Sequence, residues 1–285
     1  LVYAACLPQV SVVLVHGRLS QSSYRGYARV PALTGPMLAS LDRLLVQTPE
    51  EADRFRRLGA QADQVEVTGN IKFDLSLDDE LCDQARSLRA HFGERPVWIA
   101  ASTHEGEDEV ILDAHARVRE QVPEALLVLV PRHPERFETV AELIRTRGMA
   151  FARRSAGAEV GTAAVYLGDT MGELLLLFGT ADVAFVGGSL VPVGGHNLLE
   201  PAAWGCPVLT GPRLHNFEHV AALLEEARAM TLVDEAPDLA EAVVALLRDP
   251  ETRCRQGEAG AGVVAAHRGA LQRVLGSLSD FWSTE

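Results

Sequence analysis

FVGGSLVPVGGHNLLEP, residues 185–201, is the most informative stretch of this 285-residue chain. An apolar run ends at Val186, two Gly-Gly pairs follow, and a helical pattern begins at Leu198. Paired glycines let a backbone adopt positive φ and approach a ligand closely. The N-terminus of the following helix would direct partial positive charge at that ligand. The pattern predicts a strand, a binding loop and a helix; a glycine-rich turn without a ligand is the alternative.

Polar side chains gather in this loop. Gly194, Gly195, His196 and Asn197 converge on one strand end, and Glu200 lies one turn further on, where a carboxylate can accept hydrogen bonds from a ribose diol. The loop is not GxGxxG, and no Walker-type lysine follows it. The sequence therefore argues against NAD and P-loop sites.

Outward from this loop, short apolar runs alternate with helical patterns. The expected strands are Ser11–Val15, Arg43–Gln47, Gln64–Thr68, Val97–Ala101, Ala125–Val130, Ala150–Arg153, Val183–Val186, Pro207–Leu209 and Met230–Val233. The expected helices are Pro49–Leu58, Glu107–Gln121, Pro134–Arg147, Glu173–Phe178, Leu198–Trp204, Phe217–Ala227 and Leu239–Arg248. This alternation predicts an α/β protein with doubly wound parallel sheets.

The polar stretch Asp74–Arg95 predicts a junction between two domains. Residues 1–80 hold about three strands, too few for a complete doubly wound domain. Residues 81–265 have room for a complete Rossmann-like domain, and residues 266–285 are expected to form a C-terminal helix that crosses back to the first domain. The chain also begins at Leu1 in an apolar run, so we expect the first domain to be incomplete.

The charge distribution excludes one class of partner. With 26 basic and 39 acidic residues the net charge is −13, which argues against nucleic-acid binding. Residues 1–41 nevertheless contain Arg18, Arg25 and Arg29 and no acidic residue, so this stretch is either a membrane-facing patch or three solvated arginines. Lys72 is the single lysine of the chain. Either a lysine stands there by chance, or position 72 requires a compact ammonium group that arginine cannot replace.

Three further loops follow expected strands and could meet the glycine-rich loop. Ser102 and Thr103 could cap a helix whose free N–H groups attract anions, or could form a plain capping box. Pro131, Arg132 and His133 place two donors at a strand end, and Arg132 suits a phosphate unless it forms a surface ion pair. The third loop could hold a base or a phosphate, or could be an ordinary turn; it comprises Asp169, Thr170, Met171 and Gly172.

Metal binding is not expected. His104, His133 and His196 could meet in one cleft, but none has a ligand partner at i+4, and no DxD motif occurs. The four cysteines form no CxxC pair, which fits a reducing compartment. No apolar run is long enough to cross a bilayer.

Several motifs together resemble the family of 3-deoxy-D-manno-octulosonic acid (Kdo) transferases. They occur in order between about residues 11 and 220, and they are Gly17-Arg18-Leu19-Ser20, Thr68–Asp74, Ser102–Glu107, Pro131–Arg136, Asp169–Glu173, Gly187–Pro201, Gly211-Pro212 and Asn216-Phe217. One departure is His16-Gly17, where the family usually has Asn-Ala.

The resemblance implies a GT-B glycosyltransferase with two Rossmann-like domains, of which residues 1–80 would be the end of the acceptor-side domain. It would move Kdo from CMP-Kdo to a lipid A precursor (lipid IVA) in lipopolysaccharide biosynthesis, at the cytoplasmic face of the inner membrane. The transfer would be inverting and independent of metal and cofactor.

The resemblance also assigns roles to residues. Arg132 and its neighbours would bind the CMP phosphate, with Asn197 nearby, and Glu200 would bind the ribose. Lys72 would face the reacting centre with Arg132, and Arg18 and Ser20 would lie on the acceptor side. The family's membrane anchor and glutamate base precede the matching region, so we expect this chain alone to bind CMP weakly and transfer nothing.

Two alternatives remain open at this stage. One is a UDP-sugar-dependent enzyme of the same architecture, such as a UDP-N-acetylglucosamine 2-epimerase-like isomerase. The other is a non-catalytic module that binds a nucleotide for regulation.

Overall fold

The computed structural model describes residues 10–157 and 159–282 and divides the chain into two compact units. Unit 1 comprises residues 1–74 and 266–285, and unit 2 comprises residues 75–265. The chain therefore passes between the units twice. Among the described residues, no helix combines the length and the apolar character that crossing a membrane requires.

Unit 1 has a small parallel sheet in the order β1-β2-β3. Its strands are β1 (Val13–Gly17), β2 (Arg43–Val46) and β3 (Val65–Val67). Its helices are α2 (Gln21–Tyr27), α3 (Pro31–Ala39), α4 (Pro49–Arg57), the 3₁₀ turn η1 (Ile71–Phe73) and α13 (Ala270–Trp282). Apolar side chains from β2, α3 and α4, such as Leu44, Leu38 and Phe55, form its core.

The C-terminal helix α13 is tied to the end of β3. The carboxylate of Asp74 accepts hydrogen bonds from the backbone N–H groups of Gly269 and Leu271. Arg273 donates to the carbonyl of Thr68 at 2.8 Å. Residues nearly 200 positions apart therefore belong to one compact unit.

Unit 2 contains a seven-stranded parallel sheet in the order β10-β9-β8-β4-β5-β7-β6. The strands are β4 (Val97–Thr103), β5 (Leu126–Pro131), β6 (Phe151–Arg153), β7 (Val165–Leu167), β8 (Val183–Val186), β9 (Val208–Thr210) and β10 (Met230–Leu232). The helical elements are α5 (Asp79–Phe92), α6 (Glu107–Gln121), η2 (Pro134–Arg136), α7 (Phe137–Thr146), α8 (Leu174–Phe178), α9 (Leu199–Ala203), α10 (Glu218–Glu226), α11 (Ala236–Arg248) and α12 (Pro250–Ala266).

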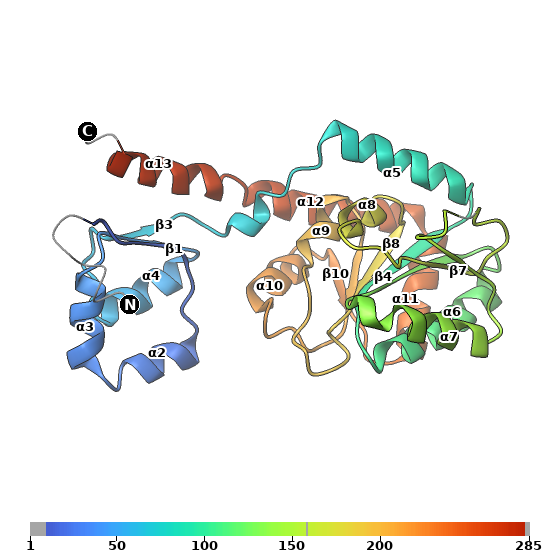
Figure 1. Cartoon of the computed structure of the whole chain (residues 1–285), viewed down its shortest axis with the longest axis horizontal. Coiled ribbons are helices and arrows are strands. Elements are labelled where there is room, and N and C mark those ends of the chain that lie inside the picture. The colour runs from blue at the N-terminus through green and yellow to red at the C-terminus, as the bar shows by residue number, and fades with distance from the viewer. Residues whose placement is uncertain (1–9, 158, 283–285) are drawn as a thin grey trace. The chain divides into compact units, whose positions relative to one another are not determined.

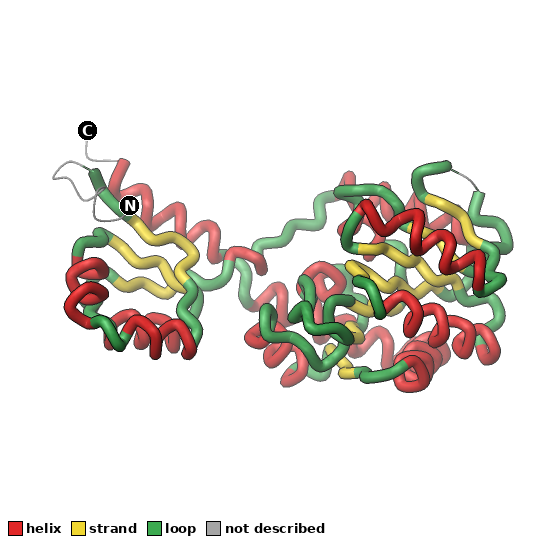
Figure 2. The backbone as a smooth tube through the Cα atoms, turned by 60° about the horizontal axis from the view of Figure 1, so that its bottom comes forward, coloured by secondary structure: helices red, strands yellow, loops and turns green. Residues whose placement is uncertain are grey.

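Helices cover both faces of this sheet (Figures 1 and 2). Trp98 and Ala100 of β4 pack toward α6, α7 and α11, whereas Val97, Ile99 and Ala101 pack toward α5 and α8. This alternation follows from the two-residue period of a strand, and burial on both faces explains why the central strands are continuous apolar runs. The strand order reverses between β4 and β8, which is where ligands bind in open α/β sheets.

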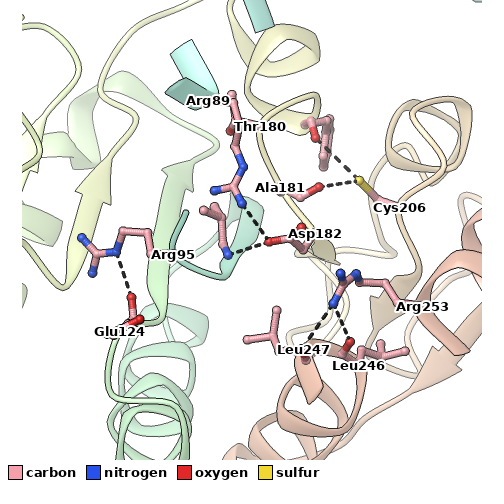
Figure 3. Close-up of polar contacts among 12 residues, drawn as sticks. Arg89, Arg95, Glu124, Thr180, Ala181, Asp182, Cys206, Leu246, Leu247 and Arg253 are labelled. Carbon is pink, nitrogen blue, oxygen red and sulfur yellow. Dashed lines mark hydrogen bonds and ion pairs between the residues drawn. The ribbon is translucent and has the colours of Figure 1, made fainter. Parts of the chain in front are cut away.

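The amino ends of the strands carry structural polar contacts (Figure 3). Asp182 accepts hydrogen bonds from the backbone N–H of Val97 at 2.8 Å and from Arg89 of α5 at 3.3 Å. The thiol of Cys206 donates to the carbonyl of Ala181, and burial raises the pKa of that thiol to about 12. Arg253 donates to carbonyl oxygens at the end of α11. These contacts attach α5 to the sheet and α12 to the end of α11.

One histidine is buried in the core. Trp98 donates through its indole N–H to Nδ1 of His115 at 3.0 Å, and Nε2 of His115 donates to the carbonyl of Ala164 at 2.9 Å. Burial lowers the pKa of His115 to about 3, so the neutral ring fills both hydrogen-bonding roles.

The α/β class and the parallel sheets predicted from the sequence are confirmed. Five elements were left out of the sequence prediction, and the longest of them is the 17-residue helix α12. The polar junction contains the 14-residue helix α5, which Asp78 caps at its N-terminus and whose Leu88 and Phe92 are buried. Strand β7, only three residues long, was missed. The short helices α2 and α3 of unit 1 were missed as well.

Candidate functional site

A cavity of about 320 Å³ opens at the carboxyl ends of the strands of unit 2. It lies where the loops after β4, β5, β7 and β8 meet. It is lined by Ser102, Val130, Pro131, Arg132, Thr170, Met171, Gly172, Leu174, Phe178, Val186, His196, Asn197, Glu200 and Phe217. All four loops predicted from the sequence contribute to this one cavity.

The glycine-rich loop is held in place by one buried carboxylate. Glu107, in the first turn of α6, accepts hydrogen bonds from the backbone N–H groups of Gly188, Ser189 and Leu190 at 2.7–3.0 Å. It also accepts one from the N–H of His104 at 2.9 Å. A side chain at Gly187 would lie 2.8 Å from the Glu107 carboxylate, which explains the glycine there.

The second Gly-Gly pair supports the loop from behind. Gly194 and Gly195 both have positive φ and do not line the cavity. A Cβ atom at Gly194 would meet His215 and Asn216 within 2.5 Å, and one at Gly195 would meet Leu214 at 2.8 Å. These glycines let two loops pack closely, and they position the next residue, His196, on the cavity wall.

Asn197 and Glu200 form a connected pair on that wall. The side-chain amide of Asn197 donates to Glu200 at 2.9 Å, and its carbonyl oxygen accepts from the N–H of Leu199 at 3.2 Å. Burial raises the pKa of Glu200, while the bond from Asn197 opposes that shift. The helix expected to bring positive charge to the cavity is α9, which has five residues, so its macrodipole is small. A cationic side chain, rather than this helix, is therefore the main source of positive potential at the cavity.

Arg132 supplies that charge. It directly follows β5, its backbone N–H donates to the carbonyl of Thr103 at 3.0 Å, and its side chain is exposed at the cavity. Its neighbour Arg136 is committed to structure instead, because it pairs with buried Asp108. Burial raises the pKa of Asp108, and hydrogen bonds from Thr103 and Arg136 oppose that shift.

Two residues of the predicted binding loops direct their side chains away from the cavity. Thr103 is fully buried, and its hydroxyl donates to Asp108 at 2.6 Å. Asp169 accepts hydrogen bonds from the backbone and hydroxyl of Ser155 and from Arg153, at 2.6–2.8 Å. Burial opposes ionisation of Asp169, but these bonds outweigh it and lower its pKa. Both side chains support the cavity from outside its lining.

Three histidines come together beside the cavity. Nε2 of His104 and Nε2 of His196 lie 2.7 Å apart, and the rings of His104 and His133 meet edge to face with centroids 5.2 Å apart. His133 is therefore a neighbour of the lining and not part of it. Among residues 10–157 and 159–282, no group of His, Cys, Asp or Glu side chains has an arrangement suited to a metal ion.

Three predicted residues belong to unit 1. Ser20 accepts a hydrogen bond from the N–H of Ser23 as the N-cap of α2. Arg18 borders a second, mostly apolar cavity of about 310 Å³. Lys72 is exposed on η1, and burial together with the charges of Lys72 and Arg18 lowers the pKa of His16. These residues do not line the cavity of unit 2.

Sequence reasoning missed the apolar part of the lining and the support behind it. The missed lining residues are Val130, Leu174, Phe178, Val186 and Phe217. Phe217 and Glu107 lie at the ends of two motifs that resemble the family, Asn216-Phe217 and Ser102–Glu107, although neither was given a role. Their place in those motifs is the signal that could have identified them. The others are apolar residues in core-like runs, which no local pattern separates from ordinary packing.

The chain is similar to proteins of one family along nearly its whole length. The family model described as 3-deoxy-D-manno-octulosonic-acid transferase matches residues 1–75. A 3-deoxy-D-manno-octulosonic acid transferase of Haemophilus influenzae is 42% identical over 284 residues, which is 99% of this chain and 66% of that protein. One of Bordetella pertussis is 39% identical over 99% of this chain, again 66% of the relative. The chain thus spans about two thirds of the length of these relatives.

Solved structures extend the comparison. The C-terminal CMP-Kdo binding domain of WaaA from Acinetobacter baumannii is 34% identical, with a TM-score of 0.63; the match covers 66% of this chain and 99% of that domain. An Anabaena protein solved in complex with UDP is 16% identical, with a TM-score of 0.60 over 98% of this chain and 75% of that protein. The second likeness supports the two-domain architecture alone.

Proposed function

The chain belongs to the Kdo transferase family, and from that premise we propose that it binds CMP-Kdo and serves transfer of Kdo to a lipid A precursor (lipid IVA). The observation that supports this most directly is the cavity of unit 2, where Arg132, His196 and Glu200 face one space. The solved relative that unit 2 resembles is described as a CMP-Kdo binding domain.

The lining divides into groups that suit the parts of a cytidine nucleotide. Arg132 and His196 would bind the phosphate, since a guanidinium binds oxyanions in a bidentate manner. Glu200 would accept hydrogen bonds from the ribose hydroxyls, with Asn197 holding its orientation. The backbone and side chains of residues 170–172, together with Phe178 and Phe217, would surround the base.

The proposed reaction is an inverting displacement. An acceptor hydroxyl attacks the anomeric carbon of Kdo, the bond from that carbon to the phosphate oxygen breaks, and CMP leaves with the bonding electrons. A base must take the hydroxyl proton, and positive groups must stabilise the departing phosphate. Arg132 fills the second requirement without a metal, and by resemblance Lys72 is proposed as a further cation at the reacting centre.

The acceptor and membrane surface are proposed for unit 1. Its α2–α3 segment exposes Tyr27, Val30 and Leu33, which are 49%, 49% and 64% accessible, beside Arg25 and Arg29. Apolar and basic side chains in one segment suit a surface of anionic lipid, as at the cytoplasmic face of the inner membrane. By resemblance, Arg18 and Ser20 are proposed to lie on this acceptor side.

Calorimetry with the 285-residue chain tests the donor assignment. CMP should bind at least about tenfold more tightly than UDP, and Glu200→Gln should weaken CMP binding by about tenfold, because one charge-assisted hydrogen bond is lost. Glu241→Gln, an exposed change on α11, is the matched control and should have no effect. Preference for UDP would favour the epimerase-like alternative, and binding of neither nucleotide would contradict the proposal.

A further inference from the structure

The His104–His196 pair joins two loops through their ring nitrogens. His104 follows β4, and His196 stands in the glycine-rich loop after β8. Their Nε2 atoms are 2.7 Å apart, their ring planes differ by 4°, and their centroids are 5.0 Å apart. The centroid separation equals the nitrogen–nitrogen distance plus one ring radius on each side. The rings therefore meet edge to edge in one plane, nitrogen to nitrogen.

Only one hydrogen fits between two nitrogens at this distance. In the neutral pair, one imidazole donates through Nε2–H and the other accepts through Nε2. The donor ring then has an unprotonated Nδ1, which can take a proton while the bridge remains. A second added proton would place hydrogens on both facing nitrogens and break the bridge. The intact pair therefore carries a charge of zero or one.

The surroundings favour the neutral pair when no anion is bound. Burial, and after it the positive charges of His104, Arg132 and His133, lower the pKa of His196 to about 4. Burial also lowers the pKa of His104; Glu107 opposes this shift, and the cations nearby add to it. The ionisable groups that face the pair are Glu107 on α6, Arg132 and His133 after β5, Arg136 on η2 and Glu200 on α9.

We propose that the His104–His196 pair takes up one proton when a nucleotide phosphate enters the cavity, so that His196 acts with Arg132 as a second cationic group toward the phosphate. This inference rests on the proposed function, because the phosphate of CMP is taken as the anion. A negative charge about 4 Å from an imidazole favours its protonated form by a factor of roughly a thousand at the effective dielectric constant of a protein. His196 lines the cavity, so it is the member of the pair that would meet the phosphate.

Proton uptake by the pair would stabilise CMP as it departs more than it stabilises bound CMP-Kdo. The phosphodiester of CMP-Kdo carries one negative charge, whereas free CMP carries nearly two at neutral pH, because its second pKa is about 6. The protonated pair is therefore stabilised more as CMP leaves than before the bond breaks, which is the direction that accelerates transfer. The proton comes from solvent and returns there when CMP dissociates.

Calorimetric titration of the 285-residue chain with CMP at pH 7, in buffers of different ionisation enthalpy, counts the protons. We expect net uptake of about 0.5 to 1 proton per CMP bound. The phosphate of CMP can only lose protons on entering a positive site, so it cannot imitate this result. The double variant His104→Gln/His196→Gln should bind CMP with no uptake, whereas His91→Gln, an exposed change on α5, should behave like the parent chain.

CMP binding without net uptake by the parent chain would overturn the inference while leaving the proposed function in place. Absence of CMP binding would overturn both. If the double variant no longer binds CMP, the ring ¹⁵N shifts of the two histidines in the parent chain decide the matter. Movement toward imidazolium values on saturation with CMP supports the pair, and unchanged shifts refute it.

Discussion

Replacing Glu107 with Gln should destabilise unit 2 far more than a surface change on the same helix. The Glu107 carboxylate accepts four backbone hydrogen bonds, from His104 and from residues 188–190. The side chain is fully buried, so water cannot replace a lost partner. The amide of Gln keeps the shape but offers one acceptor oxygen, and its NH₂ group would face N–H donors.

The magnitude follows from the number of donors left without a partner. One carbonyl oxygen can accept two of the four bonds, so two buried N–H groups lose theirs. Each unsatisfied buried donor costs about 1–3 kcal/mol, which gives a total loss of about 2–6 kcal/mol. A typical domain is stable by only about 5–15 kcal/mol, so the variant should remain folded but with much less stability.

Urea unfolding followed by tryptophan fluorescence measures this loss. Trp98 and Trp204 lie in unit 2, and a Trp282→Phe background removes the third tryptophan of the chain. Glu109→Gln, an exposed change in the same helical turn, is the control and should alter stability by less than about 0.5 kcal/mol. A loss for Glu107→Gln that matches this control would refute the claim that the carboxylate holds the loop.

Three further predictions follow from single contacts. The neutral ring of His115 takes up no proton in the folded state until about pH 3, whereas the unfolded chain does so near pH 6.5. The free energy of unfolding should therefore fall as pH decreases through this window, by about 2 kcal/mol at pH 5. Urea midpoints measured against pH check this, and His115→Gln should have a flatter profile than the parent chain. Gly187→Ala should cost about 1–3 kcal/mol because its Cβ would overlap a carboxylate and a carbonyl. The control is Gly262→Ala on α12, where an added Cβ would meet nothing within 4 Å, and it should stabilise the protein by up to about 1 kcal/mol. Equal effects of the two glycine variants in thermal unfolding would contradict the packing argument. Arg132→Lys should weaken CMP binding by about tenfold, because an ammonium cannot bind in a bidentate manner. Calorimetry tests this, with Arg117→Lys, an exposed change, as the control. Equal CMP affinities of the two variants would exclude a contact between the Arg132 guanidinium and the phosphate.

Long buried strands were the predictable part of the fold. Val97–Ala101 and Ala125–Val130 are apolar throughout because helices cover both faces of the sheet. Strand β7, with three residues, carries too little pattern to be distinguished from a loop. Helix α5 was missed because its apolar positions are sparse and only one of its faces is buried.

The candidate site was predictable loop by loop but not in detail. The polar loops could be named because each follows a strand, and parallel strands present their carboxyl ends at one edge of a sheet. Whether a side chain in such a loop faces the ligand depends on its partners. Thr103 and Asp169 turn away because Asp108 and Arg153 bind them, and those partners come from other elements.

Local pattern and motif order were therefore sufficient to establish the fold class, the family and the four loops at the site, since these depend on residues close together along the chain. The support of the glycine-rich loop by Glu107 and the union of His104 with His196 depend on contacts across 81 to 92 positions. Such contacts arise only when β4 and β8 lie side by side in the sheet, because that pairing brings their two loops within hydrogen-bonding distance.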